Sequence, residues 1–154
     1  MPPKQRFNKE SILEKAYEVF QSSGFNSVTA RSVANALNCS TQPVFSYIAT
    51  MNDVRSGIIK KAEEELLERL QTEFFLDRCI AYEKFAAEKP LVFLYLAEHD
   101  DAFSLLTSGE VRGVDWPFAI YVHGQAYLIA QGKDMGDYVQ ETAAMYGRLT
   151  STMK

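Results

Sequence analysis

The sequence has only two cysteines and no long apolar run, which argues against a disulfide-rich, zinc-binding or membrane-spanning protein. The two cysteines, Cys39 and Cys79, have a spacing that fits neither a zinc site nor a disulfide framework. No apolar stretch approaches the length of a membrane helix, and the opening Met-Pro-Pro-Lys-Gln-Arg lacks the apolar region of a signal peptide. We therefore expect a cytoplasmic protein in a reducing compartment that makes no contact with membranes.

Catalytic motifs are also missing. There is no nucleophile elbow, no Gly-rich phosphate loop, no metal-ligand spacing and no motif that pairs His with Cys or Ser. His99 has acidic neighbours on both sides, but adjacent side chains on a helix point in different directions and cannot converge on a metal. His123 lies in an apolar helical segment without a second ligand three or four residues away, which predicts a packing role. We expect no enzyme activity, no cofactor and no metal.

Charge is distributed unevenly along the chain. Residues 1–61 contain eight Lys or Arg and four Asp or Glu, a net charge of +4. The remaining residues contain eight Lys or Arg and sixteen Asp or Glu, a net charge of −8. A basic N-terminal segment followed by an acidic body is typical of a DNA-binding domain joined to a separate domain.

Helical periodicity dominates, and no convincing β-alternation occurs, so an all-α fold is predicted. In the N-terminal part, Asn8 is placed to cap a helix that ends at Gly24, which is expected in the left-handed conformation. Thr29 is placed to cap a helix over 30–37, and Ser40 a helix over 41–48, with Pro43 in the first turn of the latter. Two short helices joined by a three-residue turn are the arrangement of a helix-turn-helix.

The rest of the chain also reads as helices. A long helix over 52–75 is predicted to bridge a helix-turn-helix domain at 1–51 and a helical body at 52–154. Further helices are expected at 79–88, 91–98, 102–107, 116–131 and 137–152. The last two are the expected dimer interface, because they are long and offer small residues that allow close approach.

A series of apolar, glycine, serine and aromatic positions runs through the first 60 residues. Its members are Ile12-Leu13, Ala16, Val19-Phe20, Gly24-Phe25, Val28-Thr29, Val33-Ala34, Leu37, Ser40, Val44-Phe45, Tyr47-Ile48 and Asp53-Val54. In order and spacing this series resembles the N-terminal signature of TetR/AcrR-type transcriptional regulators. The resemblance implies an all-α homodimer with a three-helix DNA-binding head and a helical body that holds a small-molecule effector and the dimer interface.

Three positions depart from the family pattern. Asn38 stands where a turn glycine is common, and asparagine tolerates the left-handed conformation. Tyr47 replaces a histidine, and Met51 replaces a lysine that often contacts phosphate. Arg55 is a candidate to replace that lysine.

The candidate DNA-binding residues follow from the helix-turn-helix interpretation. Thr41 and Gln42 lie in the first turn of the second helix, which meets base edges, and Gln can form a bidentate pair with adenine. The other candidates are expected to contact the phosphate backbone: Thr29, Arg31, Ser40, Ser46, Tyr47, Lys4 and Arg6, with Phe45 either beside the phosphates or in the core. The alternative for each residue is an ordinary solvated surface position.

Large aromatic side chains in the body are candidates for an effector pocket, with core packing as the alternative. The candidates are Phe93, Phe103, Trp116, Tyr121 and Tyr127. Together these features predict a sequence-specific transcriptional regulator, by family habit a repressor released by its effector, that binds palindromic double-stranded operator DNA as a homodimer. A helical ligand-binding or protein-interaction module that has lost operator binding is the alternative.

Overall fold

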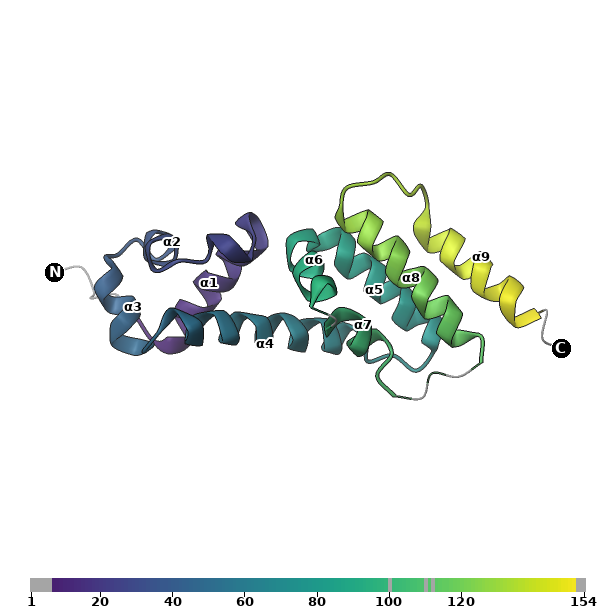
Figure 1. Cartoon of the computed structure of the whole chain (residues 1–154), viewed down its shortest axis with the longest axis horizontal. Helices are drawn as coiled ribbons and strands as arrows, with labels where there is room; N and C mark the ends of the chain where they lie inside the picture. The colour runs from purple at the N-terminus through teal and green to yellow at the C-terminus, as the bar shows by residue number, and fades with distance from the viewer. Residues whose placement is uncertain (1–6, 100, 110, 112, 152–154) are drawn as a thin grey trace. The chain divides into compact units, whose positions relative to one another are not determined.

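The computed structural model describes residues 7–99, 101–109, 111 and 113–151. Across these residues the protein is all-α, with nine α-helices, one short 3-10 turn and no β-strand (Figure 1). Contacts within the chain divide it into two compact units, residues 1–62 and residues 63–154. None of the helices in the described ranges is long and apolar enough to cross a membrane.

The helices of the first unit come in quick succession. They are α1 Lys9–Ser23, α2 Ala30–Ala36, α3 Thr41–Tyr47 and the beginning of α4 Met51–Arg69, with the 3-10 turn Phe25–Ser27 after α1. The second unit contains the end of α4 and five more helices: α5 Phe75–Glu88, α6 Pro90–Glu98, α7 Asp101–Leu106, α8 Asp115–Ala130 and α9 Tyr138–Ser151.

Three helices that begin in the first unit start with a reciprocal capping box, and the capping residues are Asn8, Thr29 and Thr50; the sequence predicts the caps at Asn8 and Thr29. The Asn8 side chain accepts a hydrogen bond from the backbone N–H of Ser11 at 2.7 Å, and the Ser11 hydroxyl oxygen accepts one from the backbone N–H of Asn8 at 3.1 Å. Thr29 and Ser32 repeat the arrangement at the start of α2, with distances of 3.2 and 2.9 Å. In each box two backbone N–H groups gain hydrogen-bond partners from residues three positions apart, so the local sequence specifies where the helix begins.

The end of α1 differs from the expectation in one respect. Gly24 has φ 83° and ψ 164°, so its backbone is extended with a positive φ rather than left-handed helical. Its N–H still donates to the carbonyl of Phe20 at 2.9 Å. The extended ψ directs the chain so that the ring of Phe25 meets that of Phe20 edge-on, with centroids 5.6 Å apart.

The core of the first unit is a layer of aliphatic and aromatic side chains from all four helices. Its fully buried members include Ile12, Phe20, Val28, Val33, Val44, Val54 and Ile58. The apolar positions recur at helical spacing, which explains why short helices with little intrinsic stability persist here.

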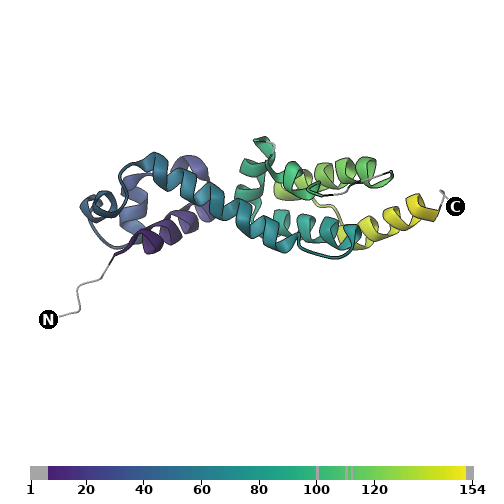
Figure 2. The same cartoon turned by 90° about the horizontal axis from the view of Figure 1, so that it is seen from below.

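In the second unit α5 packs mainly against α8, and α9 lies alongside both (Figures 1 and 2). Helices α6 and α7 contact each other, and both also contact α5. The largest fully buried apolar side chains of this unit are Tyr82, Phe85, Phe93, Phe118, Leu66, Leu96 and Leu106.

The bridging helix ends six residues earlier than expected, at Arg69 instead of about residue 75. A new helix begins at Phe75, and the Thr72 hydroxyl donates to the carbonyl of Phe74 at 3.1 Å within the intervening turn. The turn lets the Arg69 guanidinium reach Glu88, at 2.6 Å, and cover the ring of Phe85. Packing against α5 therefore overrides the helical pattern that continues past residue 70.

Candidate nucleic-acid interface

A tight turn of Leu37–Ser40 joins α2 to α3. Asn38 has a positive φ of 53°, as its position in the turn predicts. The N–H of Cys39 donates to the carbonyl of Ala34, and the N–H of Asn38 donates to the carbonyl of Asn35, both at 3.0 Å. This pair of bonds is a Schellman closure, which satisfies the last carbonyls of α2 and sets the direction in which α3 leaves.

Helix α3 has one buried and one exposed face. Val44 is fully buried and Ile48, just after the helix, is 3% exposed, so these two side chains attach α3 to the core. The opposite face carries Thr41, Gln42, Phe45 and Ser46, all exposed. Because residues three and four apart share a helix face, these four side chains form one continuous outward surface, which we call the α3 face.

The start of α3 corrects the expectation for Ser40. Its backbone occupies the N-cap position, but its side chain makes no capping hydrogen bond. The N-cap side chain normally accepts from the second or third residue of the helix, and the third residue here is Pro43, which has no N–H. The Ser40 hydroxyl is exposed and does not form a hydrogen bond with the backbone at the start of α3.

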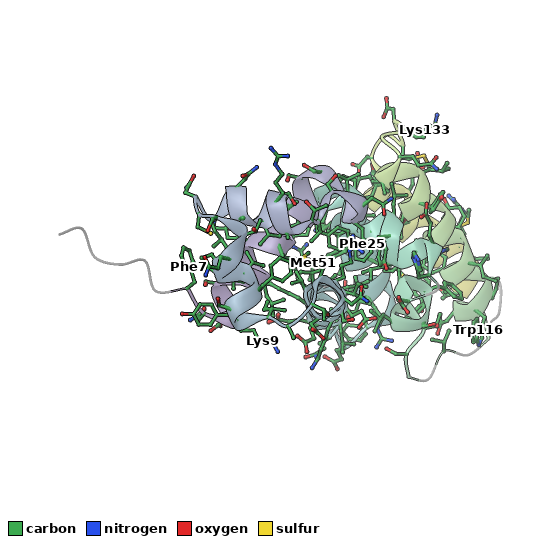
Figure 3. All side chains as sticks on the ribbon, turned by 60° about the vertical axis from the view of Figure 1, so that its left-hand side comes forward. Phe7, Lys9, Phe25, Met51, Trp116 and Lys133 are labelled. Carbon is green, nitrogen blue, oxygen red and sulfur yellow. The ribbon has the colours of Figure 1, made fainter. Side chains whose placement is uncertain are left out.

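A hollow of about 310 Å³ lies beside the α3 face. Its lining consists of hydroxyl, amide and aromatic residues and one proline: Ser40, Gln42, Pro43, Ser46, Tyr47 and Phe7, the last of which precedes α1 (Figure 3). The Ser46 hydroxyl donates to the carbonyl of Gln42 at 3.0 Å, so its oxygen remains an acceptor toward the exterior. Tyr47 is 50% exposed. The α3 face and the adjoining hollow thus bring together six of the ten candidate DNA-binding residues: Ser40, Thr41, Gln42, Phe45, Ser46 and Tyr47.

Phe45 and the remaining four candidates differ in position. Phe45 belongs to the α3 face and is 49% exposed, so it is a surface residue and not part of the core. Thr29 is exposed, but its hydroxyl already serves the cap of α2. Arg31 is exposed on α2. Lys4 and Arg6 lie outside the described residues.

Arg55 does not take the outward role considered for it. Its guanidinium donates to the carbonyl of Val28 at 3.4 Å and lies over the ring of Phe25, 5.8 Å from the centroid. The side chain is directed into the first unit because it satisfies a carbonyl between two helices there. In this conformation the Arg55 guanidinium is engaged within the first unit.

In the second unit three candidate effector-pocket residues gather around His123. The ring of Phe103 meets the imidazole edge-on at 5.1 Å between centroids, Phe93 lies 6.3 Å from it, and Trp116 lies 6.3 Å from Phe103. The Tyr82 hydroxyl and His123 Nδ1 are 2.6 Å apart, so this histidine has a hydrogen-bond partner as its apolar setting predicts. Figure 3 shows Trp116 at the edge of the unit, where α8 begins.

The other two pocket candidates do not join this cluster. Tyr121 stacks near Phe118, with centroids 6.1 Å apart, and Phe118 in turn contacts the ring of Tyr146. Tyr127 is half-buried on α8. Phe93 is fully buried, which makes it a core residue in this conformation.

A buried polar group that was not predicted from the sequence lies between α5, α8 and α9. Thr142 lies within 2.8 Å of Glu83 Oε1 and 3.1 Å of Gln125 Oε1, and the second carboxylate oxygen of Glu83 has no hydrogen-bond partner in the structure. Burial raises the pKa of Glu83 to about 7, although the hydrogen bond from Thr142 opposes the shift. Burial, reinforced by Glu83, also raises the pKa of Cys79 to about 12. Cys79, Glu83 and Ala86 recur at helical spacing and so share one face of α5, and this pattern could have predicted that Glu83 is buried.

Across the described residues, no three His, Cys, Asp or Glu side chains are grouped as metal ligands would be. The site that the structure assembles most completely is the polar and aromatic surface of α3. Comparison with protein-family models, with curated proteins and with solved structures gives no match for this chain.

Proposed function

We propose that this protein is a sequence-specific DNA-binding transcriptional regulator of the TetR/AcrR type, acting as a homodimer and as a repressor that an effector releases from palindromic operator DNA. The first unit supplies the DNA-binding surface. The second unit supplies the dimer interface and the effector site. The protein acts in the cytoplasm and is not an enzyme.

The observation that carries the proposal is the α3 face. A short helix attached to the core by Val44 and Ile48 presents exposed Thr41 and Gln42 at its N-terminal end. The Schellman closure around Asn38 holds this helix at a defined angle to α2. In helix-turn-helix proteins the N-terminal residues of the second helix contact base edges in the major groove, which is the placement of these two side chains.

Dimerisation is supported by an apolar stripe on α8. Trp116, Ile120 and Leu128 are 47%, 61% and 40% exposed, and they recur at multiples of four residues, so they share one face of the helix. Gly124 occupies the intervening position and allows a second helix to approach closely. Exposed apolar side chains in a row are typical of an interface between chains. In a DNA-bound dimer the two α3 helices would lie about 34–36 Å apart, one turn of the duplex.

Effector control would act through the second unit. The aromatic side chains packed around His123 are the candidate site, which a small ligand would reach only in a conformation that separates Phe103 or Trp116 from the buried Phe93. The two α3 helices of a dimer can bind one operator only when they lie about one duplex turn apart. A ligand that binds better to a dimer conformation with another spacing shifts the population toward that conformation and so lowers the affinity for the operator.

One observation favours the alternative, a helical module without operator binding. Residues 41–47 include no Arg or Lys, and Arg55 is directed inward. Phosphate contacts supply most of the affinity in DNA binding, so a surface poor in cations binds DNA weakly unless other residues contribute. Arg31, together with Lys4 and Arg6 ahead of α1, would have to supply that contribution.

The test of DNA binding is selection of bound sequences from a random duplex pool at physiological salt. A palindromic consensus is expected, and it should weaken in Gln42→Ala and Thr41→Ala. Gln71→Ala is the matched control for Gln42→Ala, because Gln71 is equally polar and exposed but lies in the turn after α4. Absence of enrichment above nonspecific retention favours the module without operator binding.

Salt dependence separates phosphate contacts from other binding. For a dimer, Arg31→Ala removes two cations and should reduce the slope of log K against log salt by about 2. Lys133→Ala removes an exposed cation of the second unit and should leave the slope unchanged. An identical slope for wild type and Arg31→Ala would exclude Arg31 from the DNA interface.

The dimer interface has its own matched pair of variants. Leu128 on α8 and Leu91 on α6 are 40% and 38% exposed, respectively. Leu128→Glu places a charge in the proposed interface and should yield monomers in sedimentation, whereas Leu91→Glu should remain dimeric. A monomeric wild type, or a dimeric Leu128→Glu, would contradict the proposed interface.

A further inference from the structure

We propose that the α3 face reads A·T base pairs, with Gln42 recognising adenine and Phe45 contacting the C5-methyl group of thymine. This inference rests on the proposed DNA-binding function and specifies the sequence class that the same surface recognises. It follows from which side chains α3 exposes and which it lacks.

The first argument is the absence of a guanine reader. Guanine presents two acceptors, O6 and N7, in the major groove, and proteins most often read them with the paired donors of Arg or with Lys. The exposed side chains of α3 are two hydroxyls, an amide and two aromatic rings: Thr41, Ser46, Gln42, Phe45 and Tyr47. Arg55, the first cation after α3, is bonded to the carbonyl of Val28 and does not face outward.

The second argument is the position of Gln42. It is the second residue of α3 and is exposed, so its amide lies on the helix turn that enters the groove deepest. Adenine presents the N7 acceptor beside the N6 donor, and a glutamine amide offers a donor beside an acceptor at matching separation. Glutamine at this position therefore pairs bidentately with adenine and only singly with guanine.

The third argument is the exposure of Phe45. The core of the first unit is already closed beneath α3 by Val44, which is fully buried, and Ile48, which is 3% exposed. Phe45 is 49% exposed, an unfavourable arrangement for an aromatic side chain without a partner. It lies three residues after Gln42 on the same face, so a helix in the major groove brings its ring to a base pair close to the one that Gln42 contacts. The only apolar group in that groove is the thymine methyl.

The side chains of the α3 face therefore fit a half-site with adenine at one position and thymine at or next to it. Thr41, one turn before Phe45, adds a hydroxyl that is compatible with either base and a methyl group that suits thymine. A G·C pair at the Gln42 position would set the amide oxygen of glutamine against an acceptor of guanine and leave both acceptors without a partner.

The experiment is the base preference of the wild type and of Gln42→Arg, each measured by selection from the same random duplex pool. The wild type should enrich palindromes with A·T pairs at the symmetric positions that depend on Gln42. Gln42→Arg should change one such position per half-site from adenine to guanine, because Arg presents two donors. Gln71→Arg adds the same charge away from α3 and should keep the wild-type consensus, which controls for charge alone.

A second measurement tests Phe45. Replacing the selected thymines by deoxyuridine removes only the C5-methyl groups. The wild type should lose affinity by about fourfold for each methyl that contacts the ring, as expected for one buried methyl. In Phe45→Ala the same replacement should change the affinity by less than twofold, since no ring remains to contact the methyl.

The outcomes separate this inference from the proposed function. A consensus with G·C pairs at the Gln42-dependent positions, or an unchanged consensus in Gln42→Arg, overturns A·T readout while DNA binding stands. Equal losses on deoxyuridine DNA for the wild type and Phe45→Ala overturn the role of Phe45. Absence of any consensus for the folded wild type overturns the proposed function and the inference together.

Discussion

The buried carboxyl of Glu83 leads to a quantitative prediction about stability and pH. Its side chain is fully buried and accepts one hydrogen bond from Thr142, and its second oxygen has no partner. A carboxylate in this setting loses hydration that a single hydrogen bond does not replace. Folding therefore favours the protonated form, and the pKa rises from 4.5 to about 7.

The sign of the pH dependence follows from the two states. Below about pH 4.5 the carboxyl is protonated in both the folded and the unfolded chain, and it makes no contribution to the pH dependence. Between pH 4.5 and 7 the unfolded chain releases the proton while the folded chain retains it, so the free energy of unfolding falls as pH rises. With the pKa displaced from 4.5 to about 7, the loss amounts to about 3 kcal/mol at pH 7 and does not grow much above that.

Glu83→Gln removes the pH-dependent loss of stability that this carboxyl causes and keeps the shape of the side chain. The amide oxygen of the variant can still accept from Thr142, but the amide nitrogen adds one unsatisfied hydrogen, which costs roughly 1 kcal/mol. We expect the variant to be less stable than wild type by roughly 1 kcal/mol at pH 4.5 and more stable by roughly 2 kcal/mol at pH 8. The two stability curves should cross between these values.

The assay is urea unfolding from pH 4.5 to 8.5 at fixed protein concentration, followed by the fluorescence of the single tryptophan. Trp116 lies in the second unit, as Glu83 does, so its emission reports on the relevant part of the chain. Subtracting the wild-type curve from the variant curve cancels the titration of all other groups. Glu141→Gln neutralises an exposed carboxylate of α9 and should keep the wild-type pH dependence.

A difference curve that is flat between pH 4.5 and 8 would refute the reasoning, because it would show that Glu83 titrates alike in the folded and unfolded chain. A Glu83→Gln variant that is destabilised at pH 8 would refute it as well. Thr142→Val sharpens the test, since loss of the opposing hydrogen bond should raise the pKa of Glu83 further and extend the loss of stability to higher pH.

Three smaller predictions concern single contacts. Thr29→Ala removes the capping oxygen of α2 and should lower stability by about 1 kcal/mol in thermal unfolding followed by circular dichroism. Gly24→Ala should cost about 1–3 kcal/mol in the same assay, because φ 83° with ψ 164° is strained for alanine, whereas Gly147→Ala, in a helix with open space at its Cβ, should gain about 0.5–1 kcal/mol. Tyr82→Phe removes the hydroxyl bonded to His123 and should cost about 1–2 kcal/mol in urea unfolding followed by fluorescence.

Local signals were sufficient to predict most helix starts. The capping boxes at Asn8 and Thr29 form because each capping residue is followed three positions later by a serine that returns the hydrogen bond. The positive φ of Asn38 is likewise a property of its place in a short turn. Such features depend on residues a few positions apart, and the sequence contains all of their determinants.

Features that depend on distant partners were not predictable from the pattern. The end of α4 at Arg69 follows from packing against α5, where Glu88 receives its guanidinium. The inward position of Arg55 depends on the carbonyl of Val28, on another element. Glu83 meets Thr142 across 59 residues of sequence. Periodicity identifies the face that a residue occupies on its own helix but not the residue opposite it.

Thr29 and Ser40 occupy the N-cap positions of α2 and α3, but only the hydroxyl of Thr29 makes a capping hydrogen bond. The Thr29 hydroxyl is engaged by the cap of α2, so its oxygen is less available to a phosphate, and its role in the proposed DNA complex would be to fix the start of α2. The Ser40 hydroxyl makes no capping hydrogen bond, and Pro43 removes the N–H at the third helical position, one of the two that it could bind. Helix α3 therefore depends on the burial of Val44 and Ile48 for its stability, and its polar groups stay exposed on the surface that we propose meets DNA. A Pro43→Ala variant would restore the N–H at the third position of α3, which the Ser40 hydroxyl could then cap. We expect this variant to have a more stable α3 and weaker DNA binding.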